Sequence, residues 1–234
     1  MENRLTVVII TFNEEKNIEE AILSASFASE ILVLDSGSTD STCKLVELNG
    51  GKLFHQDWLG FGPQKNKAIG LAENDWVFVL DADERFTPEL QKEVQKLVKN
   101  PECDGYFVAR LNNFFGKNIR FCGLYPDYSL RLFNKKKAKY SNSQVHESVQ
   151  MKGKSRNLKN HLLHYAYEST SEFVEKQRKY ASLSQKKKNN LKAYFSPFWV
   201  FVKIYFLRLG ILEGWRGFFI SITYARYTFW KYKK

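Results

Sequence analysis

WVFVLDADE, residues 76–84, has the pattern of a buried β-strand that runs directly into a cluster of carboxylates. Two earlier segments share its nearly continuous apolar character, LTVVII (5–10) and EILVLD (30–35). Strands that helices cover on both faces need apolar side chains on both sides, as in parallel sheets. We therefore expect these three segments to be strands of one parallel sheet.

Helices are predicted between and after these strands, at residues 14–27, 38–51, 64–72 and 87–100. The first has apolar residues along one face and acidic residues in its first turn, where the helix dipole favours them. The last begins with Thr87 and then Pro88, a preferred residue at the first helical position. This alternation predicts an α/β catalytic domain over residues 1–165, with a doubly wound, mostly parallel sheet.

The charge of the chain is concentrated in its C-terminal third. Residues 1–150 have 18 Lys and Arg against 21 Asp and Glu, whereas residues 151–234 have 18 against 4, a net charge of +14. Residues 169–194 are predicted to form a long basic helix, and apolar and aromatic residues dominate after Pro197. We expect residues 166–234 to form a basic, amphipathic helical extension.

The apolar runs of this extension are too short to cross a membrane. Charged residues interrupt each run: Lys203, Arg208, Glu213, Arg216 and Arg226. No run reaches the ~18–20 uncharged residues that span a bilayer. Helices with aromatic and cationic residues on different sides lie in the membrane interface instead. We therefore predict an anionic membrane surface as a partner, with packing on the catalytic domain as the alternative for the same helices.

Nucleic acid is not expected as a partner. The basic residues are interleaved with bulky apolar ones, which a groove-binding face would not expose.

The N-terminus lacks the basic, apolar and small-residue order of a secretory signal. The three cysteines are odd in number and widely spaced, which argues against disulfides or a zinc cluster. These features predict a cytoplasmic protein, peripheral on the inner face of the cytoplasmic membrane.

Polar and acidic residues follow each predicted strand. They are Thr11, Asn13 and Glu14 after the first, Asp35 to Asp40 after the second, and Asp81 to Glu84 after the third. Ligands of a doubly wound sheet bind beyond the carboxyl ends of its parallel strands. Like charges gathered there cost free energy unless a cation or donors offset them. Capping of the following helices is the alternative role for Thr11, Asn13 and Asp40.

The first predicted strand is not followed by a glycine-rich phosphate loop. Neither a dinucleotide site nor a P-loop is therefore expected. The pair Asp81 and Asp83 supplies hard oxygen ligands for Mg²⁺ or Mn²⁺, which can bridge two phosphates. The sequence predicts a diphosphate bound through a divalent cation.

The motifs TFNEE, DSGSTDST, Lys65-Asn66 and VLDADE, in this order and spacing, resemble glycosyltransferase family 2, whose catalytic domain has the GT-A fold. The resemblance implies a nucleotide-sugar donor and Mg²⁺ or Mn²⁺. It assigns Thr11, Asn13 and Glu14 to the nucleotide pocket, Asp35 to the uracil or ribose, Lys65 to the base or phosphates, Asp81 and Ala82 to the ribose or metal, and Asp83 to the metal as its main ligand. Related folds often add a late histidine, so His164 is a second candidate ligand, with packing in a strand as the alternative.

An inverting transfer also needs a general base for the acceptor hydroxyl, because the metal stabilises only the leaving group. In several branches of the family an R-L-F segment is followed by His-Glu, and SLRLF (129–133) with QVHESV (144–149) is similar. This similarity places the base on Glu147, with Asp127 as the other candidate. A structural ion pair of Glu147 with Arg131 or a lysine is the alternative.

Nearly the full chain resembles one branch of the family, the WaaE/KdtX-type lipopolysaccharide core glycosyltransferases. The resemblance lies in RLF with HE, in HYAY (164–167) and in KIYFLRLGILEGWRGFFISITYARYTFWKY (203–232). It implies transfer of glucose from a UDP-sugar, with inversion to a β-linkage, onto a lipid-linked acceptor such as inner-core heptose. Two other functions stay open: a metal-dependent nucleotidyltransferase of similar fold, and a non-enzymatic basic module that binds membrane or nucleic acid.

Overall fold

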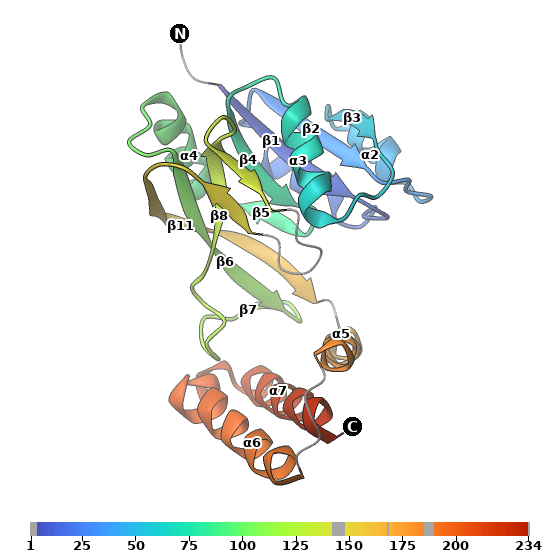
Figure 1. Ribbon diagram of the computed structural model, residues 1–234, viewed down its shortest axis with the longest axis vertical. Coiled ribbons are helices and arrows are strands. Elements are labelled where there is room, and N and C mark those ends of the chain that lie inside the picture. Colours follow the sequence, from blue (N-terminus) through green and yellow to red (C-terminus); the bar gives the residue numbers. More distant parts are fainter. Residues whose placement is uncertain (1–3, 142–147, 168, 185–189, 234) are drawn as a thin grey trace. The chain divides into compact units, whose positions relative to one another are not determined.

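The computed structural model describes residues 4–141, 148–167, 169–184 and 190–233 (Figure 1). The chain divides into two compact units, Met1–Arg110 with Tyr128–His164 and Leu111–Asp127 with Tyr165–Lys234. We call them the N-terminal unit and the C-terminal unit. The segment 111–127, which the sequence analysis expected within the catalytic domain, belongs with the C-terminal helices.

One large sheet organises the strands, in the order β3-β2-β1-β4-β8-β6-β11-β5, with β7 paired to β6. Strands β1 to β4 are parallel, whereas β8 is antiparallel to β4 and β5 is antiparallel to β11. The bounds are β1 Leu5–Thr11, β2 Glu30–Asp35, β3 Lys52–His55, β4 Trp76–Asp81, β5 Glu84–Phe86, β6 Gly105–Phe114, β7 Lys117–Asn118, β8 Asp127–Asn134 and β11 Ser155–Tyr167, while β9 Ala138–Tyr140 and β10 Val149–Met151 form a small second sheet. The predicted α/β class, with its doubly wound sheet and helical C-terminus, is confirmed.

Helices cover the parallel strands on both faces. They are α1 Ile18–Ser24, α2 Thr42–Leu48, α3 Phe61–Leu71 and α4 Pro88–Lys99. On one face, Ile22 of α1 and Val94 of α4 share a core with Val7, and on the other Ala68 of α3 packs with Val8. Neighbouring residues of β1 therefore enter opposite cores, which is why the strand is apolar at nearly every position.

Helix α4 begins where the sequence predicts. The Thr87 hydroxyl accepts a hydrogen bond from the Leu90 amide at 3.2 Å, and Pro88 is the first helical residue. Its buried residues are Leu90, Val94, Leu97 and Val98. Burial of each such side chain stabilises the fold by about 1.5–3 kcal/mol.

The C-terminal unit is mainly helical. Its elements are α5 Thr170–Leu183, α6 Asn190–Val202, a π-helical turn η1 Lys203–Leu207, a 3-10 turn η2 Gly210–Glu213 and α7 Trp215–Lys233. The prediction of one long helix over 169–194 is wrong, because α5 ends at Leu183. The amide of Ser184 donates to the Tyr180 carbonyl and closes the last turn of α5.

A separate apolar core holds this unit together. Phe114, Ile119 and Cys122 pack there with Phe173 of α5 and Ile220 of α7. Burial raises the pKa of the Cys122 thiol to about 11, so the thiol is protonated at neutral pH. The segment 111–127 therefore contributes the end of β6 and β7 to the large sheet and also packs in the helical core.

Candidate active site

The carboxyl ends of three strands meet at one edge of the sheet. In the parallel register, Thr11 of β1 lies opposite Asp35 of β2, and Ile10 lies opposite Asp81 of β4. The loops that follow these strands hold Asn13, Glu14 and Asp83. The candidate residues expected at this edge are therefore brought together from segments about 25 and 45 residues apart in the sequence, as the crevice of a doubly wound sheet requires.

Asp35 is fully buried and shapes the loop after β2. Its carboxylate accepts hydrogen bonds from the amides of Gly37 and Ser38, at 2.8 and 2.9 Å, and from the Thr11 hydroxyl at 3.1 Å. Burial raises the pKa of Asp35, but the hydrogen bonds from Ser38, Gly37 and Thr11 outweigh it and lower the pKa. A contact with uracil or ribose would have to replace one of these donors.

Side chains and amides join the loop after β1 to the loop after β2. Asn13 has a left-handed backbone, with φ 56°, its amide donates to the Ser38 hydroxyl at 2.8 Å, and its side-chain oxygen accepts from the Thr39 amide at 2.9 Å. The Asp40 carboxylate accepts from the amides of Glu15 and Thr42. Helix α1 begins only at Ile18 and has no side-chain cap. Asn13 and Thr11 therefore connect the two loops and do not cap that helix.

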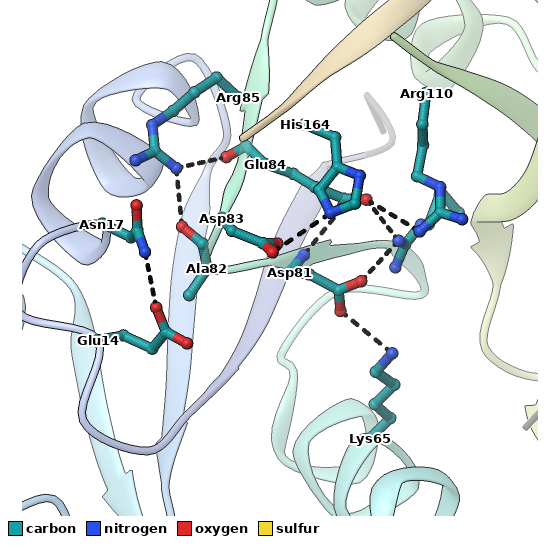
Figure 2. Close-up of polar contacts among 11 residues, drawn as sticks. Glu14, Asn17, Lys65, Asp81, Ala82, Asp83, Glu84, Arg85, Arg110 and His164 are labelled. Carbon is teal, nitrogen blue, oxygen red and sulfur yellow. Dashed lines mark hydrogen bonds and ion pairs between the residues drawn. The ribbon is translucent and has the colours of Figure 1, made fainter. Parts of the chain in front are cut away.

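A network of buried charges lies beside this edge (Figure 2). The Asp81 carboxylate pairs with the Lys65 ammonium at 3.1 Å and with the Arg131 guanidinium at 2.7 Å. Arg131 also donates to the fully buried Glu84 at 2.6 Å, and Arg110 lies 3.8 Å from Glu84. The network therefore holds three cationic side chains, Lys65, Arg131 and Arg110, around Asp81 and Glu84.

The two carboxylates of this network differ in their pKa. Burial raises the pKa of Asp81, but the charges of Arg131 and Lys65 outweigh it and hold the pKa well below its usual range. For Glu84, burial raises the pKa, and the Arg131 charge offsets only part of that effect. Asp81 is therefore ionised and already neutralised by two protein cations.

Asp83 is half-buried and faces a histidine from a distant strand (Figure 2). Antiparallel pairing of β5 with β11 sets His164 opposite Glu84, and this brings His164 Nε2 to 3.2 Å from the Asp83 carboxylate. Two ligand atoms bound at right angles to a Mg²⁺ ion, each at about 2.1 Å, are about 3 Å apart. The oxygen and nitrogen donors therefore fit a divalent cation that keeps its other positions open for a ligand.

Glu14 adds negative charge near this pair. Burial raises the pKa of Glu14, and the charges of Asp83 and Asp40 raise it further, while the hydrogen bond from Asn17 at 2.9 Å and the charge of Arg85 act in the opposite direction. A cation bound at Asp83 would relieve this repulsion. Lys65 contributes from α3, where it is buried and lies over the Tyr140 ring at 5.3 Å from its centroid.

The two candidates for the general base are Glu147 and Asp127. Glu147 lies outside the described residues. Asp127 is the first residue of β8 and belongs to the C-terminal unit. There burial, with a smaller contribution from the charge of Asp127, raises the pKa of the Tyr224 hydroxyl to about 12. Ala82 lies between the two aspartates, and its carbonyl oxygen accepts a hydrogen bond from Arg85 at 2.7 Å.

A second set of possible metal ligands is not assigned a metal. Asp35, Cys43 and His55 bring one ligand atom each within 4.8 Å of one another. Burial raises the pKa of the Cys43 thiol, and the Asp35 charge raises it further, which disfavours the thiolate that binds metals. The oxygens of Asp35 already accept several hydrogen bonds, as described above.

The sequence analysis did not include Arg131, Glu84 and Arg110 among the site residues. A signal for Arg131 was present, because LRLF places one guanidinium within an apolar strand, and a buried guanidinium needs a carboxylate partner. Its partners could not be identified, since β8 and β4 are about 50 residues apart in the sequence. The partners of Glu84 could not be identified from the sequence either, and Glu84 was considered only as part of the acidic cluster.

Comparison with known proteins shows which sequences are similar to this chain. The family model described as glycosyl transferase family 2 matches residues 6–152. The lipopolysaccharide core biosynthesis glycosyltransferase LpsC of Rhizobium meliloti (strain 1021) is 33% identical over 96% of this chain and 89% of its own length. An uncharacterized glycosyltransferase of Rickettsia bellii (strain RML369-C) is 31% identical over 95% of this chain and 82% of its own length.

A solved structure shares the fold. The crystal structure of S. aureus TarS 1-349 in complex with UDP has a TM-score of 0.51 and 18% sequence identity, over 77% of this chain. The match spans 65% of the TarS chain in that structure. At this level of identity the similarity concerns the fold alone.

Proposed function

The chain belongs to glycosyltransferase family 2, and we propose that it transfers a hexose with inversion from a nucleotide sugar to a lipid-linked saccharide. The observation that carries this proposal is the pair Asp83 and His164 at 3.2 Å, beside the network in which Lys65 and Arg131 pair with Asp81. The donor we favour is UDP-glucose, since TarS, which shares the fold, binds UDP in its crystal structure. The acceptor we favour is inner-core heptose of lipopolysaccharide, since the relative LpsC is named for lipopolysaccharide core biosynthesis.

We propose that the donor binds to the Asp83–His164 pair, to the neighbouring cations, and to the loops after β1 and β2. Asp83 and His164 would hold Mg²⁺ or Mn²⁺, which when bound neutralises the diphosphate leaving group. Lys65 and Arg131 would add positive charge from the protein, while Asp81 holds both cations in place. Thr11, Asn13, Glu14 and Asp35, with Asp81 and Ala82, are proposed to line the nucleotide-sugar pocket. The loops after β1 and β2, which Thr11, Asn13 and Asp35 connect, would then orient the base and ribose.

The deprotonation of the acceptor hydroxyl is assigned to Glu147, with Asp127 as the second candidate. The base acts on the face of the sugar opposite the diphosphate, so it must come from a segment other than the metal-binding edge. We expect Glu147→Gln to keep donor binding and lose transfer to a heptose-terminated acceptor, with Asp127→Asn measured alongside. Full transfer activity in Glu147→Gln would assign the base elsewhere, with Asp127 next.

We also propose that the protein works at the cytoplasmic face of the membrane, where a lipid-linked acceptor is presented. No helix among the described residues has the length and apolar character needed to cross a bilayer. The basic extension would instead hold the protein on an anionic surface, since each exposed cation near such a surface contributes about 1 kcal/mol. Nucleic acid is not proposed as a partner.

A donor screen tests the enzymatic proposal. Hydrolysis of UDP-, GDP- and ADP-sugars is measured with Mn²⁺, with Mg²⁺ and with EDTA. We expect metal-dependent hydrolysis of a UDP-sugar, and a loss of at least about 100-fold in Asp83→Asn. Asp75→Asn is the matched control, because Asp75 precedes the opposite end of β4 and pairs with Lys136. Hydrolysis that is unaffected by EDTA or by Asp83→Asn would contradict the proposed metal site.

A further inference from the structure

The turn between α6 and α7 exposes an unusual amount of apolar surface. We call it the apolar hairpin surface, and each of its eleven side chains is at least 37% exposed: Phe195, Phe198, Trp199, Phe206, Leu207, Leu209, Ile211, Leu212, Trp215, Phe218 and Ile222. A soluble monomer rarely leaves so many large apolar side chains together in water. The surface therefore indicates a binding partner.

The exposed residues follow the geometry of the two helices. On α6, Phe195, Phe198 and Trp199 are three and four residues apart, and on α7 Trp215 and Phe218 are three apart, so each set shares one helix face. The two stripes are adjacent, because the Phe218 ring packs on Phe201 of α6 and on Tyr205, at 5.7 and 5.9 Å between centroids. Leu207 to Leu212 form the tip between them.

Glycine packing determines the shape of the tip before any partner binds. A Cβ on Gly217 would lie 1.8 Å from the Gly210 carbonyl oxygen, so the two backbones touch. Leu209 adopts a left-handed backbone with φ 54° to make this turn. Ile204 and Ile220, on either side of the tip, are buried in the core of the unit. The apolar hairpin surface therefore needs no folding step on binding, which lowers the entropic cost of association.

Two charged residues of the hairpin, Glu213 and Arg216, are held by contacts within the unit. The buried Glu213 carboxylate accepts from the amides of Arg120 and Phe121, at 2.8 and 3.1 Å, and pairs with the Lys117 ammonium at 2.8 Å. The Arg216 guanidinium donates to the Phe115 carbonyl at 2.7 Å and lies over the Trp215 ring, 4.7 Å from its centroid. The exposed groups at the tip are therefore leucines, aromatic rings and the cationic Arg208.

The charge around the surface identifies the partner. Glu213 is the one acidic residue within 190–234, against eight Lys and Arg, and its carboxylate is buried. A second copy of this chain would bring like charges together, whereas an anionic bilayer would attract them. Exposed Trp199 and Trp215 also suit the membrane interface, where indole rings concentrate.

We propose that the apolar hairpin surface is a preformed anchor, which inserts its leucines and aromatic rings below the headgroups of an anionic bilayer without spanning it. The inference rests on the proposed function at a membrane and specifies how the protein attaches. Insertion differs from adsorption by basic residues, because salt screens attraction between exposed charges but does not weaken burial of apolar side chains.

Flotation of the full chain with vesicles tests this proposal. Vesicles of phosphatidylcholine with 30% phosphatidylglycerol are used at 0.1 M and 1 M NaCl. The test variant is Leu207→Gln with Leu212→Gln, and the matched control is Leu48→Gln with Leu183→Gln, two leucines that are also highly exposed but lie outside the surface. Both pairs are exposed, so both variants are expected to fold, which circular dichroism checks.

We expect wild-type binding to persist at 1 M NaCl, and the tip variant to lose at least about tenfold in vesicle partition. The control variant should bind as the wild type does. Loss of wild-type binding at high salt, or unchanged binding of the tip variant, would overturn insertion. A dimer in sedimentation without vesicles that the tip variant abolishes would assign the surface to a second copy instead.

The same samples separate this inference from the proposed function. Metal-dependent hydrolysis of a UDP-sugar without flotation would refute the anchor and leave the transferase proposal intact. Salt-resistant flotation without hydrolysis of any nucleotide sugar would support the anchor and contradict the enzymatic proposal. Hydrolysis of the soluble donor by the tip variant should equal that of the wild type, because the substituted leucines are not among the proposed donor-binding residues.

Discussion

The two units of the molecule depart from ordinary protein chemistry in opposite ways. The N-terminal unit buries charged groups, among them Asp35, Glu84 and Arg131, while the C-terminal unit exposes large apolar ones, such as Leu207 and Trp199. Buried charges and exposed apolar patches both cost free energy in water unless a partner compensates. We have proposed a different partner for each unit: an anion with a divalent cation for the first, and a lipid surface for the second.

The two units also differ in how far their own residues compensate for these buried charges and exposed apolar side chains. The charges of the N-terminal unit are largely satisfied within the protein, because Arg131 bonds to both Asp81 and Glu84. The apolar residues of the hairpin have no such internal partner for their exposed faces, since each is more than a third exposed. The charge network of the N-terminal unit is therefore expected to be rigid without ligand, whereas the apolar hairpin surface gains the most free energy from binding its partner. Four variants test this comparison.

The largest effect is expected from Arg131→Met. Removing the guanidinium leaves the half-buried Asp81 and the fully buried Glu84 without their main partner, which costs about 3–5 kcal/mol of unfolding free energy. The measurement is urea denaturation at neutral pH. Arg156→Met is the control, because Arg156 pairs with Glu102 at an exposed position and should change stability by less than about 1 kcal/mol. Equal effects of the two variants would show that the buried network is not structurally important.

Gly217→Ala tests the preformed hairpin. The added Cβ would overlap the Gly210 carbonyl, so the backbone must shift, at a cost of about 1–3 kcal/mol in thermal or urea unfolding. Gly70→Ala in α3 is the matched control, because nothing lies within 4 Å of its Cβ position. Alanine favours a helix over glycine by up to about 1 kcal/mol, so the control should be neutral or stabilising. Unchanged stability of Gly217→Ala would mean that the hairpin is loosely packed.

His164→Gln tests the metal site without disturbing the buried charges. We expect the Mn²⁺ concentration for half-maximal hydrolysis of a UDP-sugar to rise by about 10–100-fold. His161→Gln, on the same strand, is the control and should leave that concentration unchanged. A rise in the KM for the nucleotide sugar with no change in metal dependence would make His164 a donor contact and not a ligand.

The smallest effect is expected from Glu14→Gln. Burial, with the charges of Asp83 and Asp40, raises the pKa of Glu14 in the folded protein, so its ionised form disfavours folding. The native state then binds more protons than the unfolded chain, and the penalty is present above the raised pKa and disappears as pH falls below the unfolded value, about 4.3. Without added metal, Glu14→Gln should stabilise the protein at pH 7 by less than about 1 kcal/mol. A gain that persists at pH 4 would contradict this electrostatic origin.

Much of the N-terminal fold could be predicted from local patterns. The runs at 5–10, 30–35 and 76–81 are strands β1, β2 and β4, and Thr87 with Pro88 begins α4. Because parallel strands end at a common edge, the polar residues after these runs could be expected to meet. The strand β3 was missed, since its four residues are mostly exposed and carry no apolar run.

The sequence by itself determined that residues 5–10, 30–35 and 76–81 are strands and that polar or acidic loops follow them, because apolar runs and capping depend on neighbours in the chain. Only the tertiary structure decided which distant groups complete each site. Pairing of β11 with β5 brings His164 to Asp83, and pairing of β8 with β4 brings Arg131 to Asp81. It also decided that Glu213 is buried while the leucines beside it are exposed. Such partnerships depend on long-range strand pairing and helix packing, which local residue patterns do not record.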